Sequence, residues 1–282
     1  MSDRAPAQLQ ELKTQLEQLL ETAPTQDWIH TDPVRFPRGV ASTADREIVA
    51  IFAALIAYGR VTAIGNAITD ITTRMGSTPS LTCAADSEAD ARRRFRGFVY
   101  RVTRGEDLAR LWLGLGALLR RHGNLLDALK AFDQTDAPDF RPMLGGLREF
   151  VMTHTQNFED RRGFRHFMPD PFGGSAIKRY NMLLRWMIRG PDNIDIGDWA
   201  ELGTHRLMLP LDTHTHRIGQ RLGLTKRTQA DWRTAEDITQ TLRALAPDDP
   251  TKYDFALAHL GISGAIEDVQ WKRFVSAARI VK

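Results

Sequence analysis

Two short segments of the sequence combine residue types that could do covalent chemistry. In the first, a Gly173-Gly174-Ser175 turn leads into a helical pattern with Lys178 and Arg179 near its start. A lysine amine is a nucleophile, and the field at a helix N-terminus favours its neutral form. The backbone N–H groups of such a start also attract phosphate. The plain structural alternative is a Ser175 cap followed by two solvated basic residues.

The second segment begins at Asp212 and continues with His214, His216 and Arg217. Asp212 precedes a short helical pattern, so it could simply cap that helix. Its carboxylate could also take a proton from an amine or stabilise positive charge at a reacting carbon. The two histidines could suggest a metal, but residues two apart on a helix face different directions. We therefore expect no metal site and no cofactor.

Helical spacing of apolar residues runs through almost the whole chain, beginning with a leucine stripe that extends from Leu9 to Leu20. Alternating runs, which would indicate strands, are no longer than about four residues. The sequence therefore predicts an all-α fold. Further helices are expected over residues 46–58, 61–74, 107–121, 124–132, 140–152, 175–189, 213–222, 235–245, 254–260 and 265–281.

A segment rich in proline and glycine, residues 168–174, is the expected hinge between two helical lobes. The predicted lobes are residues 1–168 and residues 169–282. We expect Lys178 and Asp212 to face one cleft between these lobes.

The composition is that of an ordinary folded protein of 282 residues, 42% apolar and 26% charged. A single cysteine, Cys83, excludes an intramolecular disulfide and any cysteine-ligated zinc or iron–sulfur centre within one chain. The longest apolar run, Ile48 to Tyr58, is too short to span a bilayer, and the first residues lack the features of a signal peptide. We expect a cytoplasmic protein, a monomer, with no membrane partner.

The net charge of +3 hides an uneven distribution. Residues 92–121 hold nine arginines against two acidic residues, and residues 161–189 hold six arginines and one lysine against one aspartate. Such basic segments suit a polyanion, although solvated arginine-rich helix faces are an equal alternative. The residues that we expect to contact a DNA backbone are Arg60, Arg96, Arg101, Arg179 and Arg217.

Together the two chemical segments resemble those of the helix–hairpin–helix DNA glycosylases, the superfamily of endonuclease III and the 8-oxoguanine glycosylases. In its bifunctional members a nucleophilic lysine starts the second helix of the hairpin, and an aspartate starts a later helix. Lys178 and Asp212 occupy those places. The strings Gly-Ser-Ala-x-Lys-Arg and Pro-Leu-Asp-x-His are also similar to those of an uncharacterised bacterial family of this superfamily. The long separation of the two residues and the absence of iron–sulfur ligands resemble the archaeal 8-oxoguanine glycosylases.

The resemblance implies a degenerate helix–hairpin–helix element and a base-excision glycosylase with AP-lyase activity on damaged double-stranded DNA. Lys178 would attack C1′ of a flipped nucleotide, with Asp212 assisting, and 8-oxoguanine is the leading substrate. The residues of this element, Gly173, Gly174 and Ser175, would contact DNA, as would His214. Alternatives are a nucleic-acid-binding protein without this chemistry, a helical scaffold and an unrelated hydrolase. Expected walls of the base pocket are Trp271, favoured by the resemblance, with Phe172 and Trp186, and further candidates are Phe164 and Phe167.

Overall fold

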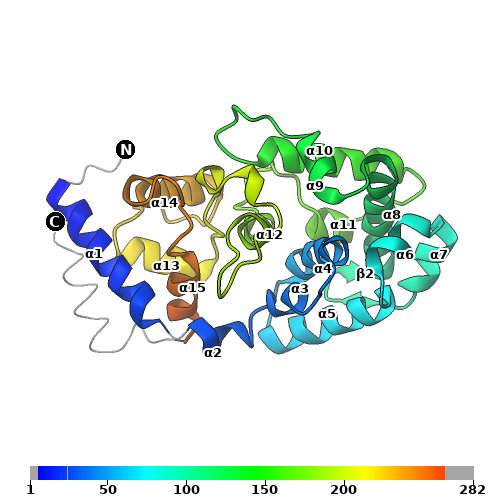
Figure 1. Cartoon of the computed structure of the whole chain (residues 1–282), viewed down its shortest axis with the longest axis horizontal. Coiled ribbons are helices and arrows are strands. Elements are labelled where there is room, and N and C mark those ends of the chain that lie inside the picture. Colours follow the sequence, from blue (N-terminus) through cyan, green and yellow to red (C-terminus); the bar gives the residue numbers. More distant parts are fainter. Residues whose placement is uncertain (1–5, 24, 264–282) are drawn as a thin grey trace. The chain divides into compact units, whose positions relative to one another are not determined.

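The computed structural model describes residues 6–23 and 25–263, and these are mostly helical (Figure 1). The prediction of an all-α protein is confirmed. Among the described residues, none of the helices combines the length and the apolar character needed to cross a bilayer. The helices and the two strands of one short hairpin are α1 (Pro6–Thr22), α2 (Thr25–Ile29), α3 (Arg35–Arg38), α4 (Thr43–Ile56), α5 (Val61–Met75), α6 (Pro79–Ala85), α7 (Glu88–Arg94), β1 (Val99–Tyr100), β2 (Thr103–Arg104), α8 (Gly105–His122), α9 (Leu125–Lys130), α10 (Arg141–His154), α11 (Arg162–Phe167), α12 (Lys178–Ile188), the 3₁₀ turns η1 (Ala200–Leu202) and η2 (Thr204–Arg206), α13 (Thr213–Arg221), α14 (Trp232–Leu245) and α15 (Asp254–Ser263).

The described chain forms two compact units. Unit 1 combines the residues up to Trp28 with those from Gly174 onward, and unit 2 is Ile29–Gly173. The junction near Gly173 lies close to the boundary at residue 168 that the sequence predicts. The N-terminal helix differs from that prediction, because α1 belongs with the C-terminal half of the chain rather than with the segment that follows it.

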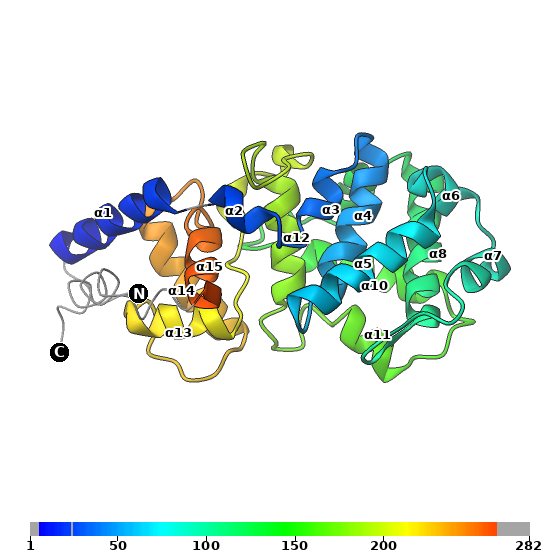
Figure 2. The same cartoon turned by 90° about the horizontal axis from the view of Figure 1, so that it is seen from below.

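The leucine stripe of α1 explains why this helix belongs to unit 1. Leu12, Leu16 and Leu19 are buried in one apolar cluster with residues of α13, α14 and α15, such as Ile238 and Leu242. Figures 1 and 2 show α1 beside the group formed by α13, α14 and α15, and α1 contacts α14. Spacing of three and four residues puts these leucines on one helix face, which is how a local pattern produces a long-range contact.

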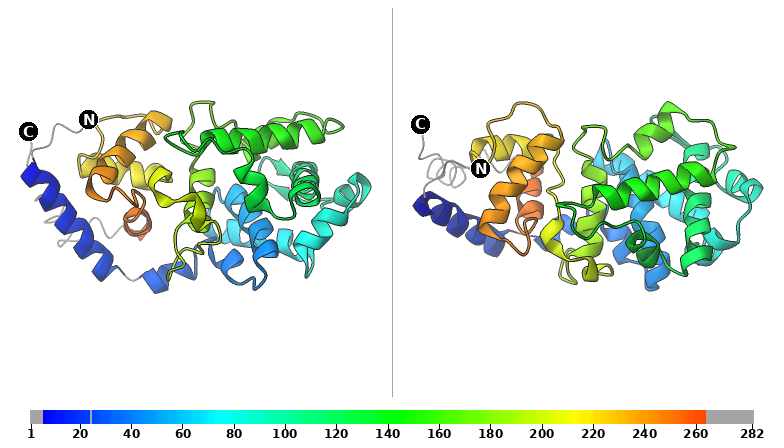
Figure 3. Two further views of the ribbon diagram at one scale, coloured as in Figure 1. Left: turned by 45° about the horizontal axis from the view of Figure 1, so that its top comes forward. Right: turned by 90° about the horizontal axis from the view of Figure 1, so that it is seen from above.

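Unit 2 is built around α8, against which α6, α7, α9 and α10 pack; these helices are cyan to green in Figure 3. Two glycines of α8 permit close packing. A Cβ on Gly114 would lie 2.7 Å from a methyl group of Val151, and one on Gly116 would lie 2.2 Å from the carbonyl oxygen of Cys83. Trp112 of the same helix packs edge-on against Phe95, with ring centroids 5.6 Å apart.

The packing of α1 gives a direct test. Leu16 has no exposed area, so Leu16→Ala leaves a cavity and should lower the free energy of unfolding by about 2–5 kcal/mol. Leu81→Ala is the matched control, because that leucine is 70% exposed and its loss should cost less than about 0.5 kcal/mol. Urea denaturation of both variants checks this. Equal, small effects would show that α1 is not part of the core.

Candidate functional site

Asp212 is the N-cap of α13, as its place in the sequence predicts. Its backbone is extended, and its Oδ1 atom accepts hydrogen bonds from the backbone N–H groups of His214 and Thr215, both at 2.9 Å. The hydroxyl of Thr215 donates to the same oxygen at 3.2 Å. One carboxylate oxygen is therefore occupied by the helix end, while Oδ2 is directed elsewhere.

The helix that carries Lys178 begins later than the sequence predicts. Ser175 does not cap it, so that prediction is wrong: Ser175 forms an isolated antiparallel bridge with Asp231, and the N–H of Trp232 donates to the carbonyl of Gly174 at 3.0 Å. Pairing with a distant segment engages the backbone of Gly174 and Ser175, and the cap position of α12 falls two residues later, at Ile177. Lys178 itself is consequently the first residue of α12.

The residue before Lys178 has an unusual backbone conformation. Ile177 has φ 38° and ψ 40°, the left-handed region that β-branched residues avoid, at a cost of roughly 1–3 kcal/mol. Its buried side chain holds it there, as does Asn181, whose side chain amide donates to the carbonyl of Ala176 at 3.2 Å. The chain thus turns sharply and rigidly just before the lysine.

Lys178 and Asp212 meet at the starts of their two helices. The Lys178 Nζ atom lies 3.0 Å from Asp212 Oδ2, and the side chains are 36% and 18% exposed. Burial acts to raise the pKa of Asp212, but the Lys178 ammonium and the Thr215 N–H together hold that pKa below its ordinary value. The contact also compensates the unfavourable placement of a cation at a helix N-terminus. Both side chains of the pair are therefore partly accessible to solvent.

A buried carboxylate lies in the same electrostatic neighbourhood. Asp254, the first residue of α15, is 3% exposed, and its pKa is raised to about 6, mainly by burial. The negative charge of Asp212 raises that pKa, while the positive charges of Arg185 and Lys178 oppose the shift. The titration of Asp254 is therefore coupled to the charges of both candidate residues.

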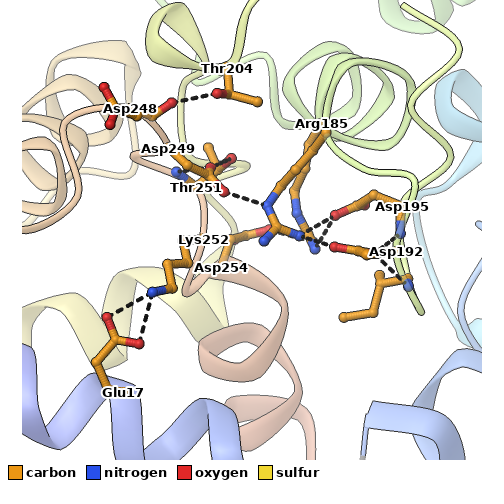
Figure 4. A network of polar contacts seen from close by, with 12 residues as sticks. Glu17, Arg185, Asp192, Asp195, Thr204, Asp248, Asp249, Thr251, Lys252 and Asp254 are labelled. Carbon is orange, nitrogen blue, oxygen red and sulfur yellow. Dashed lines mark hydrogen bonds and ion pairs between the residues drawn. The ribbon is translucent and has the colours of Figure 1, made fainter. Parts of the chain in front are cut away.

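Arg185 of α12 connects this carboxylate to a second one. Its guanidinium lies 3.0 Å from Asp254 Oδ2 and 2.9 Å from Asp195 Oδ2, with all three side chains almost completely buried (Figure 4). Arg189, one turn later, contacts Asp195 at 2.8 Å and Asp249 at 2.7 Å. These ion pairs fix α12, and with it Lys178, against the 192–195 loop and the start of α15.

The two histidines of the Asp212 segment contact backbone carbonyls. His214 Nδ1 lies 2.9 Å from the carbonyl oxygen of Gly261, and His216 Nε2 lies 2.9 Å from that of Arg227. A Cβ on Gly261 would lie 2.7 Å from the His214 side chain, so α15 approaches α13 closely at this glycine. The two rings therefore have different partners, as their spacing on a helix requires.

The remaining residues singled out in the sequence are spread over both units. In unit 1, Arg217 is exposed, Arg179 is half-buried, Gly174 and Ser175 are exposed, and Trp186 is 1% exposed in the core. Trp271 lies outside the described residues. In unit 2, the exposed residues are Arg60, Arg96, Arg101, Phe172 and Gly173, whereas Phe164 and Phe167 are fully buried.

A protein-family model matches residues 32–263, most of the chain, and its description is "Protein of unknown function (DUF2400)". The chain belongs to the DUF2400 family. No model of a glycosylase family matches, so the inferred membership of the helix–hairpin–helix DNA glycosylases is wrong. Neither the curated proteins nor the solved structures contain a match to this chain.

In this DUF2400 protein, sequence reasoning misses two charged residues that act on the Lys178–Asp212 pair, Asp254 and Arg185. Asp254 interrupts an apolar run, Tyr253 to Leu260, and a carboxylate in such a run is a signal that could have been followed. Arg185 lies among the apolar residues of α12, but in the sequence it cannot be told apart from the other arginines of the basic segment 161–189. Its partners are distant in the sequence, so their pairing has no local signature.

The buried carboxylate predicts a pH dependence. A folded-state pKa near 6, above the ordinary value of 3.8, means that the folded protein binds this proton more tightly. The contribution of Asp254 to the free energy of unfolding is therefore full below about pH 4 and is lost as the pH rises through about 6. Asp254→Asn should remove this fall, as measured by urea denaturation across pH 4–7.

Asp212→Asn is the comparison, because the pKa of Asp212 is shifted in the opposite direction. Asp212 contributes stability above its ordinary pKa, and that stability is lost as the pH falls below about 4. Asp212→Asn should therefore lower stability chiefly above about pH 4, where the contribution is present, and have little effect in stronger acid. A wild-type slope between pH 4 and 7 in the Asp254→Asn protein would contradict the assignment.

Proposed function

We propose that this DUF2400 protein is a DNA N-glycosylase and AP lyase that uses the amine of Lys178 to form a Schiff base with C1′ of a deoxyribose. The supporting observation is the contact of the half-exposed lysine with Asp212, whose other oxygen is fixed by two backbone N–H groups. A nucleophilic amine needs a nearby group to take its proton, and this geometry provides one. The choice of 8-oxoguanine rested on the overturned resemblance alone and is not part of the proposal.

The first steps follow from this arrangement. Lys178 passes a proton to Asp212 Oδ2, and the free amine attacks C1′ of a nucleotide turned out of the helical stack. The N-glycosidic bond breaks, its electron pair leaves with the damaged base, and the base takes the proton from Asp212 Oδ2. The C1′–O4′ bond then opens, O4′ is protonated, and an iminium ion joins C1′ to the lysine nitrogen. At an existing abasic site the amine adds to the aldehyde and water leaves instead.

The lyase step uses the iminium as an electron sink. A base removes a proton from C2′, the C3′–O bond breaks, and the 3′ phosphate leaves with the electron pair. Water then hydrolyses the iminium and regenerates the lysine amine. Once its proton has passed to the departing base, the carboxylate of Asp212 faces the positive nitrogen, so its charge stabilises the iminium ion. The rigid turn at Ile177 keeps the amine in place for attack.

A nucleic-acid-binding protein without this chemistry is the second candidate function. The observation in its favour is the large number of exposed arginines on unit 2, which would bind phosphates whatever Lys178 does. In that case the Lys178–Asp212 pair merely joins two helix starts, and a pair this exposed is worth at most about 1 kcal/mol. For either function we propose the cytoplasm as the compartment, because a lone cysteine, Cys83, indicates no dependence on disulfides.

Borohydride trapping on a duplex with a single abasic site tests the chemistry. The wild-type protein should become covalently attached, and Lys178→Gln should abolish both attachment and strand cleavage. Lys252→Gln is the matched control, because Lys252 also pairs with a carboxylate of unit 1, Glu17 at 2.8 Å, and is 35% exposed. That control should be trapped like the wild type. Trapping of the Lys178→Gln protein at the wild-type rate would reject the assignment.

Asp212 should matter more for catalysis than for folding. Asp212→Asn keeps an oxygen that can cap α13 but removes the proton acceptor, so trapping should slow by about 100-fold or more. Asp212→Ala loses the cap as well, and its free energy of unfolding should fall by about a further 1 kcal/mol. Trapping rates and urea denaturation measured together separate the two roles. Equal rates in Asp212→Asn and wild type would remove the carboxylate from the mechanism.

A further inference from the structure

Unit 2 carries a short β-hairpin that is rigidly anchored at its base. Strands β1 and β2 pair through Val99 with Arg104 and Tyr100 with Thr103. The hydroxyl of Tyr58 lies 2.8 Å from the Thr103 hydroxyl and donates to the Tyr100 carbonyl at 3.1 Å. The Tyr100 hydroxyl in turn donates to the carbonyl of Tyr58. These contacts fix the hairpin to the chain that follows α4.

Around this hairpin lie three adjoining hollows with volumes of about 670, 510 and 260 Å³. Arg161 lines all three, and Arg104 lines the two larger ones. No lysine lines any of them. Eight arginines line the two larger hollows against three carboxylates, those of Glu106, Glu159 and Asp160. The two larger hollows share Arg104 and Arg161 and carry an excess of positive charge, which suits a polyanion with repeating charges rather than a single small anion.

The eight arginines of the two larger hollows fall into two groups. Arg92 and Arg93 form ion pairs with neighbouring carboxylates, and Arg165 lies 3.6 Å from one. The other five form no ion pair with any residue of the part of the chain that the structure describes, and none is buried. These five are Arg96, Arg101, Arg104, Arg161 and Arg162.

Two aliphatic side chains project among these unpaired arginines. Val99 is 57% exposed and Val102, in the hairpin turn, is 46% exposed. Arg101 lies beside them with φ 52°, and its guanidinium lies so close to Gly59 that a Cβ there would be 2.7 Å from Nε. Exposed aliphatic residues framed by arginines are a combination that can contact both the phosphates and the apolar base edges of a nucleic acid.

We propose that this surface, which we call the hairpin face, binds duplex DNA: Arg104 and Arg161 contact phosphates, and Val99 and Val102 press against the bases. The hairpin face comprises the five unpaired arginines and these two valines. Guanidinium groups match phosphate oxygens in two-point hydrogen bonds, which explains the exclusive use of arginine. The choice of DNA as partner rests on the proposed function, whereas the surface itself is evident in unit 2 alone.

Salt-dependent binding of a labelled undamaged duplex to the full-length protein tests the phosphate contacts. The double variant Arg104→Gln/Arg161→Gln should bind about tenfold or more weakly at 0.1 M salt, and its salt slope should fall by about two units. Arg121→Gln is the matched control, because Arg121 is exposed on the same unit but lines none of the three hollows. The control should bind like the wild type.

A base analogue that fluoresces when unstacked tests the valines. The wild-type protein should raise the fluorescence of 2-aminopurine within a duplex, and Val99→Ser/Val102→Ser should remove this rise while keeping the salt slope. Wild-type affinity and slope in the double arginine variant would overturn the proposal. So would binding to phosphatidylserine vesicles without binding to duplex DNA, which would indicate a membrane surface.

DNA binding and borohydride trapping, both measured on the wild type, Lys178→Gln and Arg104→Gln/Arg161→Gln, separate this inference from the proposed chemistry. Binding that depends on the hairpin face, together with failure of wild-type trapping, would reject the lyase and retain the DNA surface. Trapping that depends on Lys178 but is unchanged in Arg104→Gln/Arg161→Gln would retain the lyase and reject the hairpin face as the DNA surface.

Discussion

The carboxylate of Asp212 divides its two oxygens between two tasks, and the arrangement of the candidate site depends on that division. Oδ1 satisfies the free N–H groups at the start of α13, which fixes the side chain in one rotamer. Oδ2 is then held at 3.0 Å from the Lys178 amine. A carboxylate that only paired with the lysine could follow it into solvent, whereas this one stays in place and makes a stationary proton acceptor.

The position of the amine in turn depends on a costly set of buried charges. Arg185 is enclosed with Asp195 and Asp254, and groups of this kind are often less stabilising than apolar residues of similar size. Their value to this fold is geometrical, since they join α12 to the 192–195 loop and to α15. The left-handed Ile177 adds strain at the same point. Both features raise the free-energy cost of holding the start of α12 in place beside Lys178.

The sequence predicts those features whose cause is local. The leucine stripe of α1 and the cap at Asp212 follow from spacing and side-chain chemistry over a few residues, and the structure contains both. The predicted helix cap at Ser175 is wrong because the backbone of Ser175 pairs with Asp231, far along the chain, and that pairing has no local signature. The leucine stripe of α1 likewise predicts that one face of this helix is buried, but it does not indicate which unit the face packs against.

The glycosylase resemblance failed for a related reason. It rested on short strings around Lys178 and Asp212, and strings of this length arise wherever a helix start needs a cap or a basic residue. The match to DUF2400 covers residues 32–263 and outweighs them. The lysine and the aspartate nevertheless meet in space, a fact that depends on the fold and not on the family to which the strings were assigned.

Peptide mapping of the reduced covalent complex shows directly whether Lys178 is the nucleophile. After the protein has been reduced with borohydride on an abasic duplex and digested, mass spectrometry identifies the amine that carries the sugar remnant. We predict that the remnant lies on the peptide that contains Lys178. A remnant on another lysine or on the N-terminal amine, or the absence of any adduct from active protein, would contradict it.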